Sequence, residues 1–502
     1  MRKSPILHPF LFAAYPALAF LAHNIEQTKA SAALRPLLVS LAGAVILFLI
    51  LVAVLRDYPR AGVVCSIFIG LFFTYGHVYG YLEGITLLGV TLGRHRLLAP
   101  LWLGLAAISL WWGMRRDRDL RSLSHGLNVV ALVALILPLG QIGFYQLSLR
   151  SFGSPANTPR AYASPGLVPT YGTPDIYYII LDSYSRDDML KKFYRLDNTP
   201  FLDQLEQMGF YVARCAQSNY DQTELSLASS LNYDYLDKLG GQYRPGNTRR
   251  AGLPELIQHS AVRAALKSLG YKVVAFDTGF DATRLTDADV YLAPRVSSEI
   301  NDFEETFVRT TAARLFTEGV ASLNLPPDWE ARDQAHRERI LFELEQLKQI
   351  PGLPGPKFVF AHIITPHWPY IFGPNGEPVH ERPESTTGYR DQVMFINQQI
   401  LPILDQILAQ SKTPPIIIIQ GDHGAVLQDP HRRMSILNVY HLPDGGESQL
   451  YESISPVNTF RVILNHYFGT QLPLQEDVSY YSSYEQPYDY KVIDNTRPGC
   501  QP

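Results

Sequence analysis

Several long apolar runs without a charged residue lie within the first 150 residues. Four of them are long enough, at about 1.5 Å per helical residue, to cross a hydrocarbon core of about 30 Å. They are Leu37–Leu55, Ala61–Leu82, Leu97–Met114 and Gly126–Leu147. This pattern predicts an N-terminal domain of transmembrane helices, residues 1–150, embedded in a lipid bilayer.

A fifth apolar run, Ile6–His23, is shorter and contains two prolines. Arg2 and Lys3 precede it and Ala17–Ala19 resembles a cleavage site, so one interpretation is a signal peptide. The bulky apolar residues after that site favour the other interpretation, a retained helix. With it, the expected bundle has about five spans.

Basic residues predict the orientation of these helices. If the N-terminus lies inside, eight Lys and Arg residues fall on the inner side and four fall in the outer loops, in agreement with the positive-inside rule. The cluster Arg115–Arg121 contributes most to this difference. Five crossings, or a cleaved signal followed by four, place everything after Leu147 outside the cytoplasm.

A different pattern begins after residue 150. Residues 151–174 contain five prolines among Ser, Gly and Thr, which is typical of an extended linker. Short apolar runs then predict strands at Ile176–Leu181, Tyr211–Ala213, Tyr271–Phe276, Phe358–Ala361 and Pro415–Gln420. Between and after them, helices are predicted at Thr199–Met208, Pro254–Leu269, Pro327–Gln349, Asp391–Gln410 and Val457–Phe468. This alternation predicts an α/β domain, residues 175–475, with a mostly parallel sheet between helices. A Tyr-rich tail, residues 476–502, follows.

Charge separates the same two parts of the chain. The 502 residues have a net charge of −4, but the first 150 contain 13 Lys and Arg against 5 Asp and Glu. The remaining 352 residues contain 30 and 42, so a segment of +8 precedes one of −12. The composition excludes a disordered chain and a disulfide scaffold. The composition and the net charge of −4 also argue against a strongly basic nucleic-acid binder.

Polar residues follow three of the predicted strands. Asp182 comes directly after the first strand, His362 follows Phe358–Ala361, with His367 soon after, and Gly421–Gly424 (Gly-Asp-His-Gly) follows the strand of isoleucines. In doubly wound sheets, ligands bind beyond the carboxyl ends of the strands. We therefore expect these residues to lie along one edge of the sheet.

Asp422 and His423 between two glycines are the sharpest signal of chemistry. Two adjacent side chains can face one cation only if the backbone turns sharply, and glycines permit such a turn. A carboxylate and an imidazole suit Zn²⁺, Mn²⁺ or a related divalent ion. Asp182 would supply a second carboxylate.

The candidate nucleophile lies in the run SNYDQTELSLASSLN, residues 218–232. Thr223 opens a predicted helix, Glu224–Leu231, where a cation and the helix N-terminus would both favour a deprotonated hydroxyl. The alternative is a structural role, in which Thr223 or Asp221 caps the helix. Ser226 is a second candidate nucleophile, one turn inside the helix.

In this order, these residues resemble the alkaline phosphatase superfamily, and more narrowly its membrane-anchored, sulfatase-like group of lipoteichoic acid synthases and phosphoethanolamine transferases. The resemblance rests on LDSYSRDD, YDQTELSLASSLN, FAHIITPHWPY and GDHG. It implies one divalent metal ion (Mn, Mg or Zn), held by Asp182, Thr223, Asp422 and His423. It further implies Thr223 as covalent nucleophile and His367 as a ligand of the transferred group's oxygens. A multi-pass protein of the plasma membrane with an extracytoplasmic catalytic domain is expected.

The sequence lacks two motifs that other members of the superfamily carry, and each absence narrows the reaction or the metal content that the resemblance implies. Formylglycine sulfatases carry the run Cys or Ser, any residue, Pro, any residue, Arg around the nucleophile. This run is missing here, since Cys215 is followed by Ala-Gln-Ser. This argues against sulfate-ester hydrolysis. No Asp-x-x-x-His occurs between Thr223 and Asp422, which favours one metal over two.

Further residues are candidates for substrate binding. His431, Arg432 and Arg433 follow Asp-His closely and would hold a phosphate or a headgroup, or else form a solvated basic patch. His362 is a candidate through its place after a strand. The substrate-binding residues predicted are therefore His362, His367, His431 and Arg433.

Three functions fit these features. Transfer of a phosphoryl-containing group in the cell envelope, from a phospholipid or another phosphoester, is the first. Hydrolysis of a phosphate or sulfate ester at the same site is the second, and a non-catalytic membrane-bound interaction protein is the third. Outside the membrane only Cys215 and Cys500 could form a disulfide, and the sequence leaves that pairing open.

Overall fold

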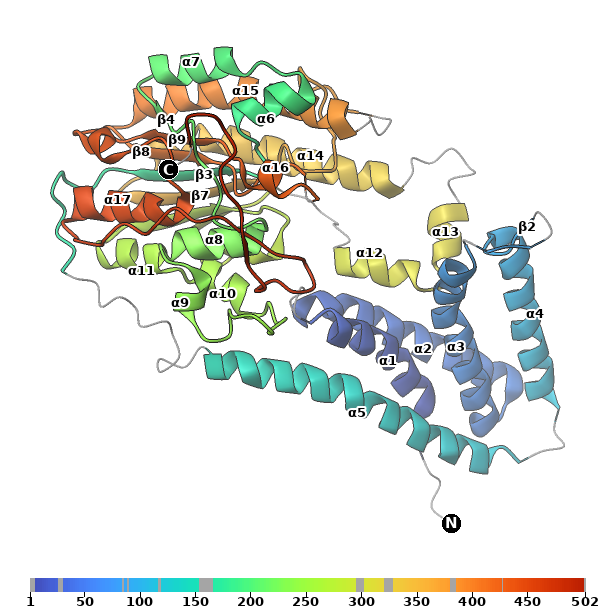
Figure 1. Cartoon of the computed structure of the whole chain (residues 1–502). Coiled ribbons are helices and arrows are strands. Elements are labelled where there is room, and N and C mark those ends of the chain that lie inside the picture. Colours follow the sequence, from blue (N-terminus) through green and yellow to red (C-terminus); the bar gives the residue numbers. More distant parts are fainter. Residues whose placement is uncertain are drawn as a thin grey trace. The chain divides into compact units, whose positions relative to one another are not determined.

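The computed structural model describes residues 5–25, 30–83, 85–87, 90–115, 119–152, 166–294, 302–319, 328–379, 385–426 and 428–500. The chain divides into two compact units (Figure 1). Unit 1 comprises Met1–Ser151 and Ser297–Ala331, and unit 2 comprises Phe152–Val296 and Arg332–Pro502. Most of the predicted linker, residues 153–165, lies outside the described residues.

Unit 1 contains the predicted apolar helices. They are α1 (His8–His23), α2 (Leu34–Leu55), α3 (Tyr58–Leu82), α4 (His95–Met114) and α5 (Arg121–Phe152), with the two-residue strands β1 (Thr86–Leu87) and β2 (Val90–Thr91) before α4. In the described part of the chain, four helices are long and apolar enough to cross a membrane: those ending at Leu55, Leu82, Met114 and, for its apolar part, Leu147. The predicted run at Ile6–His23 also forms a helix, but α1 has only 16 residues.

Small residues and one buried histidine pack the helices of unit 1. Ala13 and Ala17 of α1 are fully buried, which lets neighbouring backbones approach closely. The His8 ring lies 2.6 Å from the Ser66 hydroxyl of α3 and 2.9 Å from the Ser124 hydroxyl of α5. These contacts join three helices that are far apart in the sequence.

A segment from the second half of the chain also belongs to unit 1. Helices α12 (Asp302–Arg309) and α13 (Arg314–Gly319) follow residues of unit 2 in the sequence but pack with α1–α4. Phe307 lies against Phe73 of α3 at 5.8 Å between ring centroids. The Ala312 amide donates to the Phe72 carbonyl at 2.7 Å. Hydrophobic periodicity alone did not predict this association.

Unit 2 is built around a sheet whose described strands run in the order β4-β9-β8-β3-β7-β5-β6 (Figure 1). The parallel strands are β3 (Ile176–Leu181), β5 (Lys272–Phe276), β6 (Val290–Leu292), β7 (Lys357–Ile363) and β8 (Ile416–Gln420). Two antiparallel strands, β4 (Tyr211–Val212) and β9 (Asn438–His441), complete one edge. The predicted mostly parallel sheet is confirmed, and every residue of β3 is buried, as expected for a strand covered on both faces.

Helices cover both faces of this sheet. One face packs against α8 (Thr223–Leu231), α10 (Gly252–Gln258), α11 (Ala261–Ser268) and α17 (Pro456–Phe468). The other packs against α6 (Asp187–Tyr194), α7 (Thr199–Gln207), α14 (Asp328–Leu347) and α15 (Ser385–Gln410). The short helices α9 (Leu236–Leu239) and α16 (Pro430–Met434) and the two-residue strands β10 (Tyr480–Tyr481) and β11 (Lys491–Val492) complete the unit.

Two predicted elements differ from the structure. The single helix expected at Pro254–Leu269 is split into α10 and α11, because the Ser260 side chain caps a new helix by accepting from the Arg263 amide. Strand β7 extends to Ile363, so His362 lies within the strand rather than after it. The sequence signal stopped at the polar residue, but pairing with β3 continues through it.

The C-terminal tail is fixed to unit 2 by a disulfide between Cys215 and Cys500. Arg497 adds an ion pair to Asp187 at 2.6 Å and a hydrogen bond to the Arg214 carbonyl. The disulfide closes a loop of 285 residues, and removing a native disulfide of this kind costs about 2–5 kcal/mol of stability.

Replacing Cys500 by Ser is therefore expected to lower the melting temperature of the full chain in detergent. Adding a reductant should lower the melting temperature of the natural protein toward that of Cys500→Ser and leave the variant unchanged. Equal melting of the two proteins without reductant would show that the bond contributes nothing to stability.

Glu343 of α14 gives a second prediction, about pH. Burial, followed by the nearby charge of Asp277, raises the pKa of Glu343 to about 8. The folded protein therefore holds a proton that the unfolded chain releases above about pH 4.5. The contribution of Glu343 to stability must fall as the pH rises from about 4.5 to about 8, by at most about 1.4 kcal/mol per pH unit.

Glu343→Gln cannot ionise. The melting temperature of this variant minus that of the natural protein should therefore increase from pH 5 to pH 8 and stay constant above pH 8. Glu345→Gln is the matched control, because Glu345 lies on the same helix with a side chain that is 58% exposed. A difference that does not depend on pH for Glu343→Gln would contradict the buried, protonated carboxyl.

Candidate metal centre

Three adjacent strands bring the candidate residues to one edge of the sheet. Strand β3 lies between β7 and β8, with Ile180 paired to both His362 and Gln420. Asp182 follows β3 directly, and Asp422 stands two residues after β8. The carboxyl ends of parallel strands meet here, so the topology alone places these side chains together.

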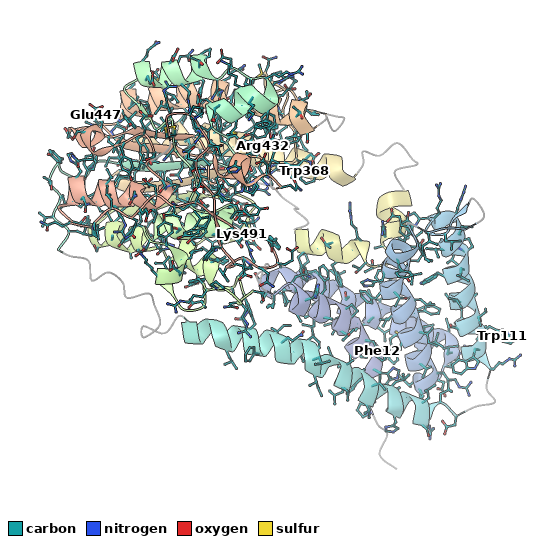
Figure 2. The ribbon with its side chains drawn as sticks, viewed as in Figure 1. Phe12, Trp111, Trp368, Arg432, Glu447 and Lys491 are labelled. Atoms are coloured by element: carbon teal, nitrogen blue, oxygen red, sulfur yellow. A yellow bond between two sulfur atoms is a disulfide. The ribbon has the colours of Figure 1, made fainter. Side chains whose placement is uncertain are left out.

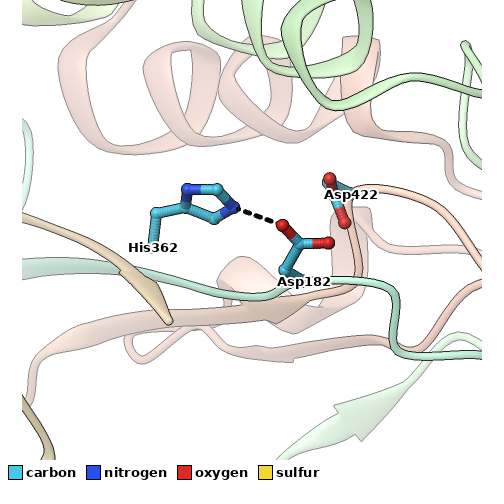
Figure 3. A group of neighbouring side chains, drawn as sticks. All are labelled: Asp182, His362 and Asp422. Atoms are coloured by element: carbon cyan, nitrogen blue, oxygen red, sulfur yellow. Dashed lines mark ion pairs between the residues drawn. The ribbon is translucent and has the colours of Figure 1, made fainter. Parts of the chain in front are cut away.

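Asp182, His362 and Asp422 form a buried group (Figure 3). Each offers one ligand atom, and these atoms lie within 4.8 Å of one another. Nε2 of His362 is 3.3 Å from Oδ2 of Asp182. Such spacing is compatible with one cation between the three side chains.

His423 and Thr223 lie beside this group. Nε2 of His423 is 3.2 Å from Oδ2 of Asp422, 3.9 Å from Oδ1 of Asp182 and 3.1 Å from Oγ1 of Thr223. Ligands about 2.1 Å from a tetrahedral ion stand roughly 3.4 Å apart. The four residues expected to hold a metal are therefore close together, and His362 joins them.

The proton on His423 can be assigned from its surroundings. Nδ1 lies 3.1 Å from the Gly424 carbonyl oxygen, which can only accept a hydrogen bond. Nδ1 therefore carries the proton of the neutral ring, and Nε2 turns its lone pair toward Thr223 and Asp422. Burial, with the charge of Arg433 next, lowers the pKa of His423, which favours this neutral form.

The two glycines beside Asp422 and His423 have another reason than the one expected. In the structure both have ordinary φ values, since neither Gly421 nor Gly424 has a positive φ. A Cβ at Gly421 would lie 2.5 Å from the Tyr184 carbonyl oxygen, and one at Gly424 would collide with the Arg432 backbone. Glycine is required because other backbone segments approach closely, and not because the bend at Asp422 and His423 needs a positive φ at either glycine.

Ser183, which the sequence analysis did not single out, orients the acidic groups. It has a φ of 67°, unusual for a residue with a side chain. This conformation directs its amide to Oδ1 of Asp422 at 2.9 Å and its hydroxyl to Oδ1 of Asp182 at 3.0 Å. One residue thus fixes both carboxylates.

The electrostatics of the site call for positive charge. Burial, followed by the charge of Asp182, raises the pKa of Asp422 to about 6. Burial also opposes ionisation of Asp182, but His367, His362 and His423 together hold its pKa below the usual value. Oδ2 of Asp422 and Nε2 of His362 are buried and make no hydrogen bond within the described residues. A divalent cation would satisfy both atoms and both charges, so the residues fit a metal site.

Thr223 does not cap its own helix. The residue before α8 in capping position is Gln222, and no side chain caps this end. Asp221 does not cap it either, because its Oδ1 accepts from the Ser482 amide of the tail at 3.2 Å. Ser226 is fully buried, 3.1 Å from the Ser218 hydroxyl. Of the two candidate nucleophiles, only Thr223 lies at the acidic group.

The residues predicted to bind substrate are distributed differently. His362 is fully buried, between the Thr283 hydroxyl at 3.0 Å and Asp182, so it faces the acidic group and not an exposed surface. Arg433 is buried against the Asp-His turn and donates to the carbonyls of Asp221 and Gly424. His367 is half-buried in the loop after β7.

Two other basic side chains, His431 and Arg432, lie closer to the surface of unit 2. His431 is exposed and lies 3.3 Å from the Asp494 carbonyl of the tail. Arg432 stacks on Phe193, with 3.9 Å between the guanidinium carbon and the ring centroid. Figure 2 labels Arg432 and Trp368, the exposed neighbour of His367. The structure thus brings His362, Arg433 and the four expected ligands together, and leaves His431 at the surface.

These features define the class of the protein. It is an α/β protein with a buried cluster of two carboxylates and two histidines, preceded in the chain by helices able to cross a membrane. The chain belongs to the sulfatase family, whose pattern matches residues 174–461. This match confirms the predicted resemblance to the alkaline phosphatase superfamily. Comparison with curated protein sequences gives no match.

The comparison with solved structures finds a phosphoethanolamine transferase and a sulfatase among its matches. The C-terminal periplasmic domain of EcEptC from Escherichia coli, in complex with Zn, is 14% identical (TM-score 0.44; 67% of this chain and 98% of that chain covered). Phosphoethanolamine transferase A from Neisseria meningitidis, an integral membrane protein, is 13% identical (TM-score 0.38; 92% and 94%). A 2-O GAG sulfatase is also 13% identical (TM-score 0.40; 63% and 79%). At these values the likeness carries no functional argument.

The site predicts metal-dependent stability. Zn²⁺ or Mn²⁺ at a hundredfold excess over its dissociation constant should stabilise the full chain by about 2.7 kcal/mol, seen as a higher melting temperature. Asp422→Asn should lose this response, because it removes a ligand charge. Asp203→Asn, an exposed aspartate of α7, is the matched control. A full response in Asp422→Asn would exclude Asp422 as a ligand.

Proposed function

We propose that this protein is a membrane-anchored metalloenzyme that transfers a phosphoryl-containing group through a covalent intermediate on Thr223. The observation that supports it most is the position of the Thr223 hydroxyl, 3.1 Å from the lone-pair nitrogen of His423 and beside two buried carboxylates. A threonine at a helix N-terminus next to such a group is suited to nucleophilic attack.

In this proposal Asp182, Asp422, His423 and Thr223 hold one divalent ion, Zn, Mn or Mg. When bound, the ion would lower the pKa of the Thr223 hydroxyl and neutralise charge on the phosphoryl oxygens. His362 would position Asp182, since its other nitrogen is 3.0 Å from Thr283. Ser183 would position both carboxylates through its amide and hydroxyl.

The reaction proceeds in two displacements at phosphorus. In the first, a bond forms between Thr223 Oγ1 and phosphorus while the bond from phosphorus to the leaving alcohol breaks, and the alcohol departs with a proton. In the second, the hydroxyl of an acceptor attacks phosphorus, the bond to Thr223 breaks, and the threonine regains its proton. Water in place of the acceptor turns the same sequence into hydrolysis.

Substrate contacts are proposed for the residues around this centre. His367 is half-buried and near enough for its charge to lower the pKa of Asp182, so it is proposed to bind the non-bridging oxygens. Arg433 is proposed to act beside it while holding the Asp-His turn. His431, at the surface, would contact the more distant part of a headgroup.

A lipid-linked donor fits the organisation of the chain. Four described helices can cross a membrane, and the basic residues between them favour an extracytoplasmic location for unit 2. An enzyme fixed to the membrane shares one surface with a phospholipid donor, so a phospholipid is the proposed substrate class. Nucleic acid is not expected as a partner of an acidic unit.

The test compares Thr223→Ala with Ser226→Ala in purified full chain. Each protein is given a headgroup-labelled phospholipid with an acceptor lipid, an aryl phosphate and an aryl sulfate. Thr223→Ala should lose roughly a thousandfold or more in turnover of every substrate that the natural protein accepts, while Ser226→Ala stays active. The natural protein should yield labelled acceptor.

Other outcomes discriminate between the alternatives. Label found only as water-soluble product would replace transfer by hydrolysis. Turnover of the aryl sulfate alone would assign a sulfate ester. An active Thr223→Ala with an inactive Ser226→Ala would move the nucleophile, and the absence of turnover together with a metal response would leave a metal-binding protein that is not an enzyme.

A further inference from the structure

A cavity of about 450 Å³ lies in unit 1, at the junction of α3 and α4. It is lined by Tyr79, Glu83, Gly93, Arg94, His95 and Arg96. None of these residues belongs to the metal centre. We propose that this cavity binds the headgroup of an anionic phospholipid. The proposal concerns the membrane unit and does not rest on the reaction proposed for unit 2.

The floor of the cavity is built from fixed aromatic rings. His95 stacks on Tyr79 with 4.5 Å between ring centroids, and its Nδ1 lies 2.8 Å from the Tyr75 hydroxyl. At Gly93 any side chain would collide with the Glu83 backbone, and the Gly93 amide donates to the Leu82 carbonyl at 3.1 Å. These contacts hold the end of α3 and the start of α4 in one arrangement, which gives the cavity a defined shape.

Positive charge dominates the rim. Arg94 and Arg96 are exposed, and neither forms an ion pair with any residue in the described part of the chain. The one carboxylate of the lining, Glu83, is 3.6 Å from the Arg314 guanidinium of α13. Arg314 also stacks on Tyr79, with 4.0 Å between its guanidinium carbon and the ring centroid. Glu83 is thus neutralised, and two arginines remain to bind an anion.

The surface below the rim suits acyl chains. Leu97 and Leu101 stand four residues apart, so they share one face of α4, and Arg94 directly precedes the first residue of this helix. Leu97 is 41% exposed and Leu101 is 55% exposed. A phosphate on Arg94 and Arg96 therefore continues into apolar surface, which a phospholipid covers and a free phosphate does not.

The topology puts the cavity on the side of the membrane where unit 2 begins. From the start of α4 to the end of α5, the chain crosses twice if both helices span the bilayer. The two ends then lie on the same side. Lys and Arg near the membrane surface attract anionic headgroups by charge, and Tyr79 and Tyr81 are typical of the interfacial region.

Native mass spectrometry of the purified full chain can test this site. The protein in neutral detergent is titrated with phosphatidylglycerol and, separately, with phosphatidylcholine. One phosphatidylglycerol should bind more tightly than phosphatidylcholine. Arg94→Gln/Arg96→Gln should weaken this binding roughly tenfold or more, since each arginine near a headgroup contributes about a factor of five. Arg121→Gln is the control, as its side chain is exposed at the start of α5.

A gain-of-binding variant guards against misfolding. Glu83→Gln removes the carboxylate that neutralises Arg314, so the variant gains net positive charge at the cavity and should bind phosphatidylglycerol more tightly than the natural protein does. Equal affinity for the two lipids, or unchanged binding in the double variant, would overturn the proposal. Displacement of the lipid by millimolar inorganic phosphate would also overturn it, in favour of a free-phosphate site.

Turnover of a soluble aryl phosphate separates this inference from the proposed function. The double variant should keep that turnover, because both arginines lie outside unit 2. Loss of lipid binding with unchanged turnover supports a headgroup site in unit 1. If the cavity binds lipid but the protein shows no turnover, the headgroup site is still supported, and only the proposed enzymatic function of unit 2 is contradicted.

Discussion

Two buried carboxylates, Asp182 and Asp422, stand at the ends of neighbouring parallel strands, and the rest of the site is organised around their mutual repulsion. The central place of β3 in the sheet forces them together, because β8 pairs with it along its length. Isolated negative charges are costly inside a protein. Histidines from β7 and from the turn after β8 lie beside the carboxylates, and Ser183 donates hydrogen bonds to them from its amide and its hydroxyl. The spacing of these groups also suits a cation. The carboxylates therefore explain why so many polar groups are buried at one edge.

That edge depends on backbone contacts as much as on side chains. Gly421 and Gly424 admit close approach of the Tyr184 carbonyl and the Arg432 backbone, and Arg433 ties the turn to the loop before Thr223. The same loop is held from the other side by the tail, through Ser482 and Asp221. Thr223, the Asp-His turn and the C-terminal tail are consequently one packed assembly. The disulfide at Cys215 keeps the end of the tail beside it.

Much of this could be predicted from the sequence, and the limits have physical causes. Strands such as Ile176–Leu181 are short, apolar and buried on both faces, so their pattern is unmistakable, and parallel topology then places Asp182 near Asp422. The pattern fails where polarity conflicts with pairing: His362 stays in β7 because its backbone still bonds to β3. Local sequence also cannot reveal long-range partners. The capping position of α8 falls on Gln222, and the Thr223 hydroxyl instead contacts His423, 200 residues away.

The least predictable feature is the return of the chain from unit 2 to unit 1. Helix α12 is short and amphipathic, and in sequence it looks like a surface helix of the α/β domain. Phe303 and Phe307 nevertheless bury their rings among the membrane helices, against Phe20 and Phe73. A helix of eight residues has little stability of its own, so its conformation depends on that apolar contact. The two units are therefore joined by three stretches of chain rather than one, and a single linker after α5 does not describe how the enzyme is attached to its membrane part.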